Sequence, residues 1–107
     1  SMKNSNQYVQ ENLTQEQILA FLRAHKEQLK NEFGVTQIAL FGSYARGDQQ
    51  PESDIDLLIK TTTHAFRNRL RLKEYLEQSL GRRVDINYFD TVRGFIMHHI
   101  QKDIVYA

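Results

Sequence analysis

The sequence has no cysteine, no tryptophan and a single proline among its 107 residues. Without cysteine the chain can form no disulfide, offer no thiolate to zinc and use no thiol as a nucleophile. It also lacks an apolar run near the roughly 20 residues that a membrane-spanning helix needs, and it does not open with a secretory signal. We therefore expect a cytoplasmic protein that does not enter a membrane.

Charge of one sign is not in excess: 14 Lys and Arg stand against 13 Asp and Glu, a net charge of +1. Because nucleic-acid binding usually needs a clear positive excess, the balance argues against direct nucleic-acid binding. The length suits one domain with one core. We interpret residues 1–13 as a polar lead-in, in which Ser1 before Met2 is a remnant of an expression tag, and residues 14–107 as a single domain.

Hydrophobic periodicity predicts alternating helices and strands. Helical spacing predicts one helix from a capping box at Thr14 and Gln17 to a stop at Gly34, a second over 66–80 and a third near 95–100. Short apolar or alternating runs predict strands over 35–41, 55–59, 84–89 and 104–106. This order predicts an α/β fold, a small mixed β-sheet with helices packed mainly on one face.

The most informative residues follow the first strand. Gly42 allows a sharp turn there and close approach of a ligand to the backbone. Ser43 would begin a short helix whose free N–H groups favour an anion. The sequence therefore predicts a phosphate-binding turn at this position.

Two carboxylates, Asp54 and Asp56, lie on a strand that is otherwise apolar. A period of two puts both on one face, where they repel each other unless a cation lies between them. Oxygen donors without nearby His or Cys favour Mg²⁺ or Mn²⁺ over zinc. The alternative is a solvated edge-strand face or a pair that caps a helix, which leaves the position of Gly42 and Ser43 unexplained.

A longer motif joins two glycines, two serines and two acids, which are Gly42, Ser43, Gly47, Ser53, Asp54 and Asp56. This motif resembles the signature of the DNA polymerase β-like nucleotidyltransferase superfamily, and Asp85 matches the third acid that the superfamily carries on a later strand. The short form Gly-Ser-Tyr-Ala-Arg-Gly looks most like the minimal nucleotidyltransferases. Many of these are antitoxins of HEPN-domain ribonucleases. The resemblance extends from about Gly34 to the last residue.

The resemblance implies a mechanism in which AMP passes from ATP to an acceptor hydroxyl and pyrophosphate leaves. Asp54, Asp56 and Asp85 would be catalytic and would hold two Mg²⁺ ions. Four residues would complete the nucleotide site: Gly42, Ser43, Arg46 and Ser53. Of these, Ser53 would orient the first carboxylate or the turn before it, and Arg46 would either reach the triphosphate or remain solvated.

The function implied is a Mg²⁺-dependent protein adenylyltransferase, an antitoxin that modifies a tyrosine of a cognate HEPN toxin. Two alternatives stay open: transfer to a small hydroxylated molecule with help from a partner subunit, and a non-catalytic module that masks the toxin by contact. The basic segment from Arg67 to Arg83 is either a solvated helix face or a surface for an acidic partner.

Overall fold

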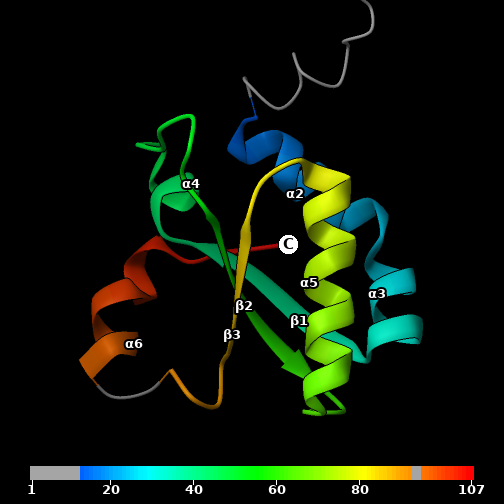
Figure 1. Ribbon diagram of the computed structural model, residues 1–107. Coiled ribbons are helices and arrows are strands. Elements are labelled where there is room, and N and C mark those ends of the chain that lie inside the picture. The colour runs from blue at the N-terminus through cyan, green and yellow to red at the C-terminus, as the bar shows by residue number, and fades with distance from the viewer. Residues whose placement is uncertain (1–12, 93–94) are drawn as a thin grey trace, which may run out of the picture.

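The computed structural model describes residues 13–92 and 95–107 (Figure 1). Its α-helices are α2 (Gln15–Ala24), α3 (Lys26–Phe33), α4 (Ser43–Arg46), α5 (Phe66–Leu80) and α6 (Phe95–Ile100). A 3₁₀ helix, η1 (Gln101–Asp103), follows α6. The strands are β1 (Val35–Phe41), β2 (Ile55–Thr61), β3 (Val84–Tyr88) and β4 (Val105–Tyr106). The strands and helices expected from periodicity are therefore present, except that the first expected helix is divided in two.

The strands form one mixed sheet in the order β3-β2-β1-β4. Strand β1 runs antiparallel to both β2 and β4, whereas β2 and β3 are parallel. The register pairs Phe41 with Asp56 across β1 and β2, and Asp56 with Asp85 across β2 and β3. The predicted α/β class with a small mixed sheet is confirmed, and the sheet brings the end of β1 beside two of the predicted acids.

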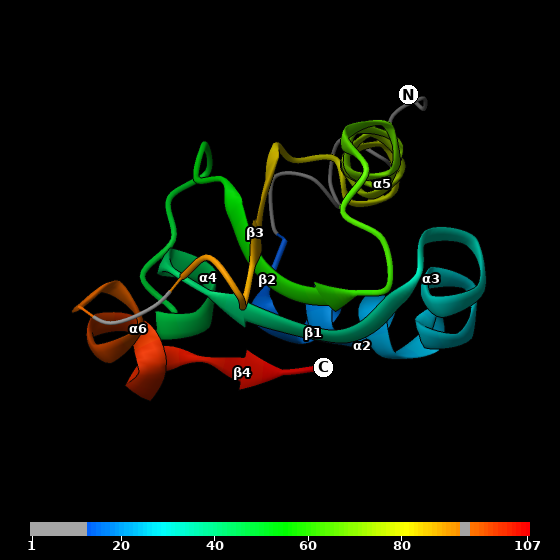
Figure 2. The ribbon, with the colours of Figure 1, turned by 90° about the horizontal axis from the view of Figure 1, so that it is seen from below.

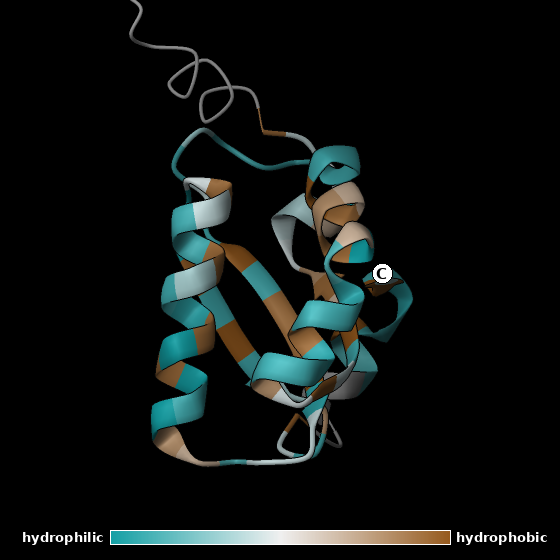
Figure 3. Cartoon of the chain, turned by 90° about the vertical axis from the view of Figure 1, so that its right-hand side faces the viewer, coloured by the Kyte–Doolittle hydropathy of each residue, from teal (hydrophilic) through white to brown (hydrophobic). Residues whose placement is uncertain are grey.

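The main core lies between one face of the sheet and helices α2, α3 and α5. Ile18, Leu29 and Leu76 come from the three helices, and Leu57 and Ile86 from the strands; all are at most 1% exposed. In Figure 3 brown bands mark the apolar positions of the strands, and the helices in front are largely teal on their outer sides. Amphipathic helices thus bury the apolar face of the sheet, as the helical spacing predicts.

The opposite face of the sheet carries a smaller apolar cluster. Ala39, Leu58 and Val92 are buried there, and Ile100 and Ile104 pack against them. Figure 2 shows α6 and α5 on opposite sides of the sheet, with β4 running beside β1. The segment after β3 therefore covers the face that also carries Asp56, because Asp56 and Leu58 are two residues apart on one strand.

The region expected to be one helix from Thr14 to Gly34 is instead two helices. The backbone leaves helical geometry at His25, which has φ −109° and ψ 18°, and α3 starts at the next residue. The ring of His25 stacks on Phe21 at 4.0 Å between centroids, and its Nδ1 lies 2.8 Å from the Phe21 carbonyl oxygen. No apolar side chain between Leu22 and Leu29 holds this stretch on the core, so the helix can break there.

The boundary between the expected lead-in and the domain shifts by one residue, because Leu13 belongs to the domain. Residues 1–12 of the expected lead-in lie outside the described residues, but Leu13 is only 6% exposed and belongs to the main core. It precedes the capping box of α2, in which Thr14 Oγ1 accepts a hydrogen bond from Gln17 N and Thr14 N donates to Gln17 Oε1. An apolar residue just before a helix cap anchors the entry of the chain.

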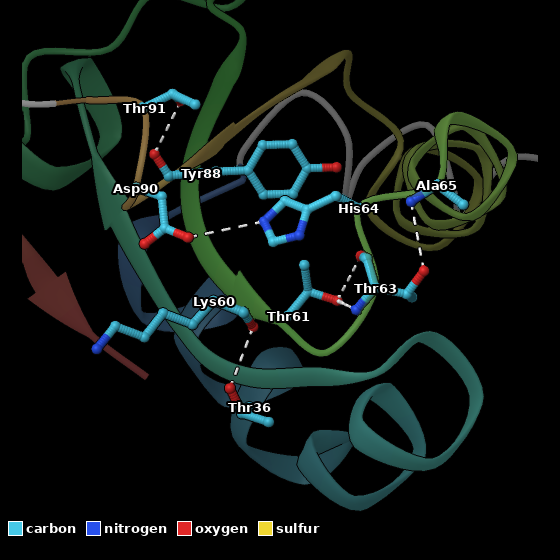
Figure 4. A network of polar contacts seen from close by, with 9 residues as sticks. All are labelled: Thr36, Lys60, Thr61, Thr63, His64, Ala65, Tyr88, Asp90 and Thr91. Atoms are coloured by element: carbon cyan, nitrogen blue, oxygen red, sulfur yellow. Dashed lines mark hydrogen bonds and ion pairs between the residues drawn. The ribbon is translucent and has the colours of Figure 1, made fainter.

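A polar network closes the far end of β2 and β3 (Figure 4). The imidazole of His64 lies against the ring of Tyr88 with 4.7 Å between centroids, and His64 Nε2 is 3.8 Å from Asp90 Oδ2. Because this network follows the last residue of each strand, it is at the end of the sheet opposite Asp54. Among the described residues no helix has the length and apolar character that crossing a bilayer requires.

Candidate active site

The turn of residues 42–47, called the Gly42 turn below, is set by its first glycine. Gly42 has φ 77° and ψ −154°, a conformation almost restricted to glycine. A Cβ added at Gly42 would lie 2.1 Å from Asp56 Oδ2 and 3.0 Å from Asp56 Cγ. The missing side chain therefore lets the backbone of the turn contact the carboxylate of β2 directly.

The short helix expected after Gly42 is confirmed as α4. The Gly42 carbonyl oxygen accepts hydrogen bonds from Ala45 N and Arg46 N, both at 3.1 Å. The helix ends at Gly47, where φ is 83°, and Tyr44 inside it is 1% exposed and part of the main core. The ring of Tyr44 therefore packs inward and helps to anchor the turn on the core.

The three predicted acids converge at the same end of the sheet. Asp56 and Asp85 are register partners on adjacent strands, and Asp54 immediately precedes β2. Burial, followed by the nearby charges of Asp85 and Asp54, raises the pKa of Asp56 from 3.8 to about 6, whereas Arg46 opposes the shift. The folded protein therefore disfavours the ionised form of the half-buried Asp56.

Two of these acids are engaged by neighbouring side chains. Arg83 Nε lies 3.0 Å from Asp54 Oδ1 in an ion pair, and Asn87 Nδ2 donates to Asp85 Oδ2 at 3.4 Å. As the side chains are oriented, no three His, Asp or Glu of residues 13–92 and 95–107 are grouped so that they could share a metal ion.

An open cavity of about 560 Å³ lies in front of the Gly42 turn. Six of the seven predicted site residues line it, namely Gly42, Ser43, Arg46, Ser53, Asp54 and Asp56. Asp85 does not line the cavity and is exposed on the neighbouring strand. Phe41 and Ile100 add an apolar wall from β1 and α6. The structure therefore groups most of the predicted residues around one opening.

Arg46 and Ser53 each have a local partner. Arg46 Nε is 3.1 Å from Asp48 Oδ2, with both side chains largely exposed. Ser53 closes the turn before Asp54, since Ser53 Oγ accepts from Gln50 N at 2.8 Å and Ser53 N donates to the Gln50 carbonyl oxygen at 3.0 Å. Ser53 is thus in a position to fix the approach of the chain to Asp54.

Sequence reasoning did not single out two residues that contact this site. Arg83 was counted in a general basic segment, but it immediately precedes β3 and pairs with Asp54, which immediately precedes β2. Gln15 belongs to no motif in the sequence, yet its side-chain amide donates to two carbonyl oxygens of the Gly42 turn. No local signal could have revealed Gln15, because the contact spans about thirty residues of sequence.

The donor set suits a hard cation in its chemistry. All three acids offer oxygen only, and Asp56 and Asp85 are side by side in the register of a parallel pair. The crowding that raises the pKa of Asp56 is of the kind that a bound cation relieves. The residues present therefore fit a Mg²⁺-type site in type and backbone position.

Comparison with known proteins decides the family. A family model described as a nucleotidyltransferase domain matches residues 22–106, which is most of the chain. The chain belongs to the nucleotidyltransferase domain family. It is 38% identical over 96 residues to the protein adenylyltransferase MntA of Thermococcus cleftensis, and this match covers 89% of the chain and 97% of the relative.

Solved structures place this nucleotidyltransferase among small relatives. A protein provisionally described as a minimal nucleotidyltransferase superimposes with a TM-score of 0.73 at 27% identity, covering 88% of this chain and 96% of that one. A toxin–antitoxin crystal structure with AMP-PNP contains a chain that matches with a TM-score of 0.54 at 29% identity, covering 76% and 61%. The resemblance to minimal nucleotidyltransferases noted in the sequence is confirmed.

A matched pair of glycine substitutions tests the packing of the turn. Gly42 and Gly47 both have positive φ, but an added Cβ meets Asp56 at Gly42 and nothing within 4 Å at Gly47. We expect Gly47→Ala to lower the free energy of unfolding by about 1 kcal/mol through backbone strain alone. Gly42→Ala should cost about 1–3 kcal/mol more, because its backbone conformation is almost restricted to glycine and the added Cβ also overlaps Asp56. Equal losses in urea denaturation would show that the turn is not packed on Asp56.

A second prediction concerns pH. Because the pKa of Asp56 is raised in the folded protein, the folded state retains a proton that the unfolded chain releases between about pH 4 and pH 6. Ionised Asp56 therefore destabilises the fold, and its contribution falls as pH rises through this range. Asp56→Asn should become progressively more stable relative to the wild type from pH 4 to 6, then stay level. Denaturation midpoints measured with a chelator present check this; a constant difference contradicts it.

Proposed function

We propose that the protein is an antitoxin that transfers AMP from ATP to a tyrosine of a cognate HEPN-domain ribonuclease toxin. The observation that carries the proposal is the close contact of the Gly42 turn with Asp56, beside Asp54 and Asp85. Similarity to the adenylyltransferase MntA supports AMP transfer, and similarity to a toxin–antitoxin complex with AMP-PNP supports ATP and a toxin partner. ATP as donor agrees with the cytoplasmic location expected from the sequence.

The transfer forms one bond and breaks one. The tyrosine oxygen attacks the α-phosphorus, the bond from that phosphorus to the bridging oxygen breaks, and pyrophosphate leaves. We assign acceptance of the phenolic proton to Asp85. The exposed position of Asp85 on β3 supports this role, since an acceptor delivered by another protein must approach from solvent.

Asp54, Asp56 and Asp85 would hold two Mg²⁺ ions. When bound, these ions supply charge neutralisation at the phosphate oxygens and lower the pKa of the acceptor hydroxyl. The raised pKa of Asp56 supports this assignment, because a cation-binding carboxylate is commonly strained by like charge in its own fold. Arg83 lines the same cavity beside Asp54 and would offer its positive charge to an anionic ligand.

Residues of the turn would bind the triphosphate. Gly42 and Ser43 would donate their backbone N–H groups to the β- and γ-phosphates, and the Ser43 hydroxyl would add a further donor. Arg46 lines the same cavity and would neutralise phosphate charge after leaving Asp48. Ser53 would keep the turn before Asp54 closed. Each of these roles needs a donor or a fixed backbone, which is what the residue offers.

The acceptor has to be brought by another molecule. The cavity is open on one side, and the described part of the chain adds no second domain over it. A protein acceptor that docks beside the cavity and inserts one side chain meets this geometry. This reasoning favours a toxin protein over a small hydroxylated acceptor.

A thermal-shift experiment tests the proposed ligands. A ligand that binds only the folded state stabilises it by mass action, so Mg²⁺ with ATP should raise the melting temperature of the wild type. Asp54→Asn should lose most of this rise, because it removes a proposed cation ligand. Asp90→Asn makes the same charge change at the far end of the sheet and should retain the rise. If the melting temperature of Asp54→Asn rises as much as that of the wild type, Asp54 does not bind the cation.

A co-expression experiment tests transfer itself. Wild-type protein should leave the toxin heavier by one or more AMP units in intact-mass measurements, on a tyrosine located by peptide analysis. Asp56→Asn is nearly isosteric and should still bind the toxin, but the transfer rate should fall by orders of magnitude. The toxin should then stay unmodified and active.

Two outcomes separate the alternatives. If Asp56→Asn rescues cells as well as the wild type at matched expression, and neither changes the toxin mass, the protein masks its toxin by contact. If the wild type releases pyrophosphate only when a small hydroxylated compound is present, the acceptor is that compound and not the toxin.

A further inference from the structure

Carbonyl oxygens at the C-terminal end of α4 accept hydrogen bonds from a residue outside the Gly42 turn. A four-residue helix leaves its last carbonyl oxygens without partners inside the helix. The Ser43 oxygen accepts from Gly47 N at 2.8 Å and from Asp48 N at 3.1 Å. The Tyr44 and Ala45 oxygens instead both accept from one donor, Gln15 Nε2, at 2.9 Å and 2.8 Å.

Gln15 is itself fixed by its own helix. It is the first residue of α2, and Ile18 and Leu22 of that helix are fully buried in the main core. The capping box at the start of α2 uses Thr14 and Gln17, so the Gln15 side chain is not needed to begin the helix. The half-buried amide of Gln15 can therefore donate its hydrogen bonds to the Gly42 turn, about thirty residues along the sequence.

Rigid peptide planes carry this restraint to the start of the turn. The Tyr44 oxygen and Ala45 N–H share one plane, and the Ala45 oxygen and Arg46 N–H share the next, so fixing each oxygen fixes the N–H. Both N–H groups donate to the Gly42 oxygen. That oxygen shares its plane with Ser43 N–H. Two hydrogen bonds to Gln15 thus restrict the direction of the Ser43 donor.

We propose that Gln15 is a positioning residue for nucleotide binding, which aims the backbone N–H of Ser43 at the triphosphate without touching it. The inference rests on the proposed function, because it takes the Gly42 turn as the triphosphate site. The turn is held at three points: the Gly42 backbone on Asp56, the Tyr44 ring in the core and the two carbonyl oxygens on Gln15. The first two contacts do not bind the carbonyl oxygens of residues 44 and 45, and the two hydrogen bonds from Gln15 add a restraint there to the backbone hydrogen bonds inside the turn.

The test compares Gln15→Leu with Thr14→Ala. Both change the start of α2, but Gln15→Leu removes the donor to the turn, whereas Thr14→Ala removes the helix cap and leaves that donor. We expect Gln15→Leu to weaken ATP binding about tenfold, as loss of about 1.4 kcal/mol implies. Titration calorimetry with ATP and Mg²⁺ measures this. Thr14→Ala should lower the melting temperature and leave the ATP affinity within about twofold of the wild type.

Two further readouts separate positioning from simple structural loss. Amide hydrogen exchange without nucleotide should quicken at residues 43–47 in Gln15→Leu and not in Thr14→Ala. In AMP transfer to the toxin, Gln15→Leu should raise KM for ATP and change kcat little, because Gln15 does not touch the reacting atoms. If Gln15→Leu does not fold, Gln15→Asn replaces it; one methylene shorter, Asn cannot reach both oxygens and should give the same pattern.

The outcomes distinguish this inference from the proposed function. If the wild type binds ATP and Gln15→Leu binds it equally well with unchanged exchange at residues 43–47, Gln15 has no positioning role and the proposed function stands. Equal weakening of ATP binding by Thr14→Ala and Gln15→Leu would likewise show that Gln15 contributes only to the overall stability of the fold. If the wild type binds no ATP, the proposed function fails and the inference fails with it.

Discussion

The contact between the Gly42 backbone and the Asp56 carboxylate joins the two halves of the site. It exists because antiparallel pairing of β1 and β2 sets Phe41 opposite Asp56, so the chain leaves β1 directly over that carboxylate. Parallel pairing of β2 and β3 then adds Asp85 on the other side. Asp56 of β2 therefore contacts the Gly42 turn and lies beside Asp85. The register of the strands thus determines which residues meet at the site.

Two ion pairs lie at the site, Arg46 with Asp48 and Arg83 with Asp54. The second pair includes a residue of the basic segment from Arg67 to Arg83. Arg83 belongs to the site through Asp54. Arg69 donates to the Ile86 carbonyl oxygen on the edge strand and lies over the ring of Tyr88. Arg71 lies over the ring of Phe33. Arg69, Arg71 and Arg83 therefore each have a partner within the fold, so part of the basic segment has a structural role.

Much of this arrangement could be predicted from sequence because it is local. Period-two alternation places Asp54 and Asp56 on one face, and a glycine that ends a strand marks the turn. The missed features arise from tertiary contacts. The break at His25 follows from a ring that stacks on the preceding turn, and the burial of Leu13 follows from a core that periodicity alone does not locate. Arg83 and Gln15 find partners 29 and about 30 residues away, where no spacing rule operates.

The two-residue strand β4 has a consequence for how the site is made. It pairs Leu40 with Val105 and Ala39 with Tyr106, and the segment before it supplies Ile100 to the cavity wall. These are among the most sequence-distant contacts of β1, and distant contacts form late because closing a long loop costs entropy. Until β4 has paired, β1 keeps one open edge and the opening lacks Ile100 in its wall, so the site is completed by a contact that forms late in folding.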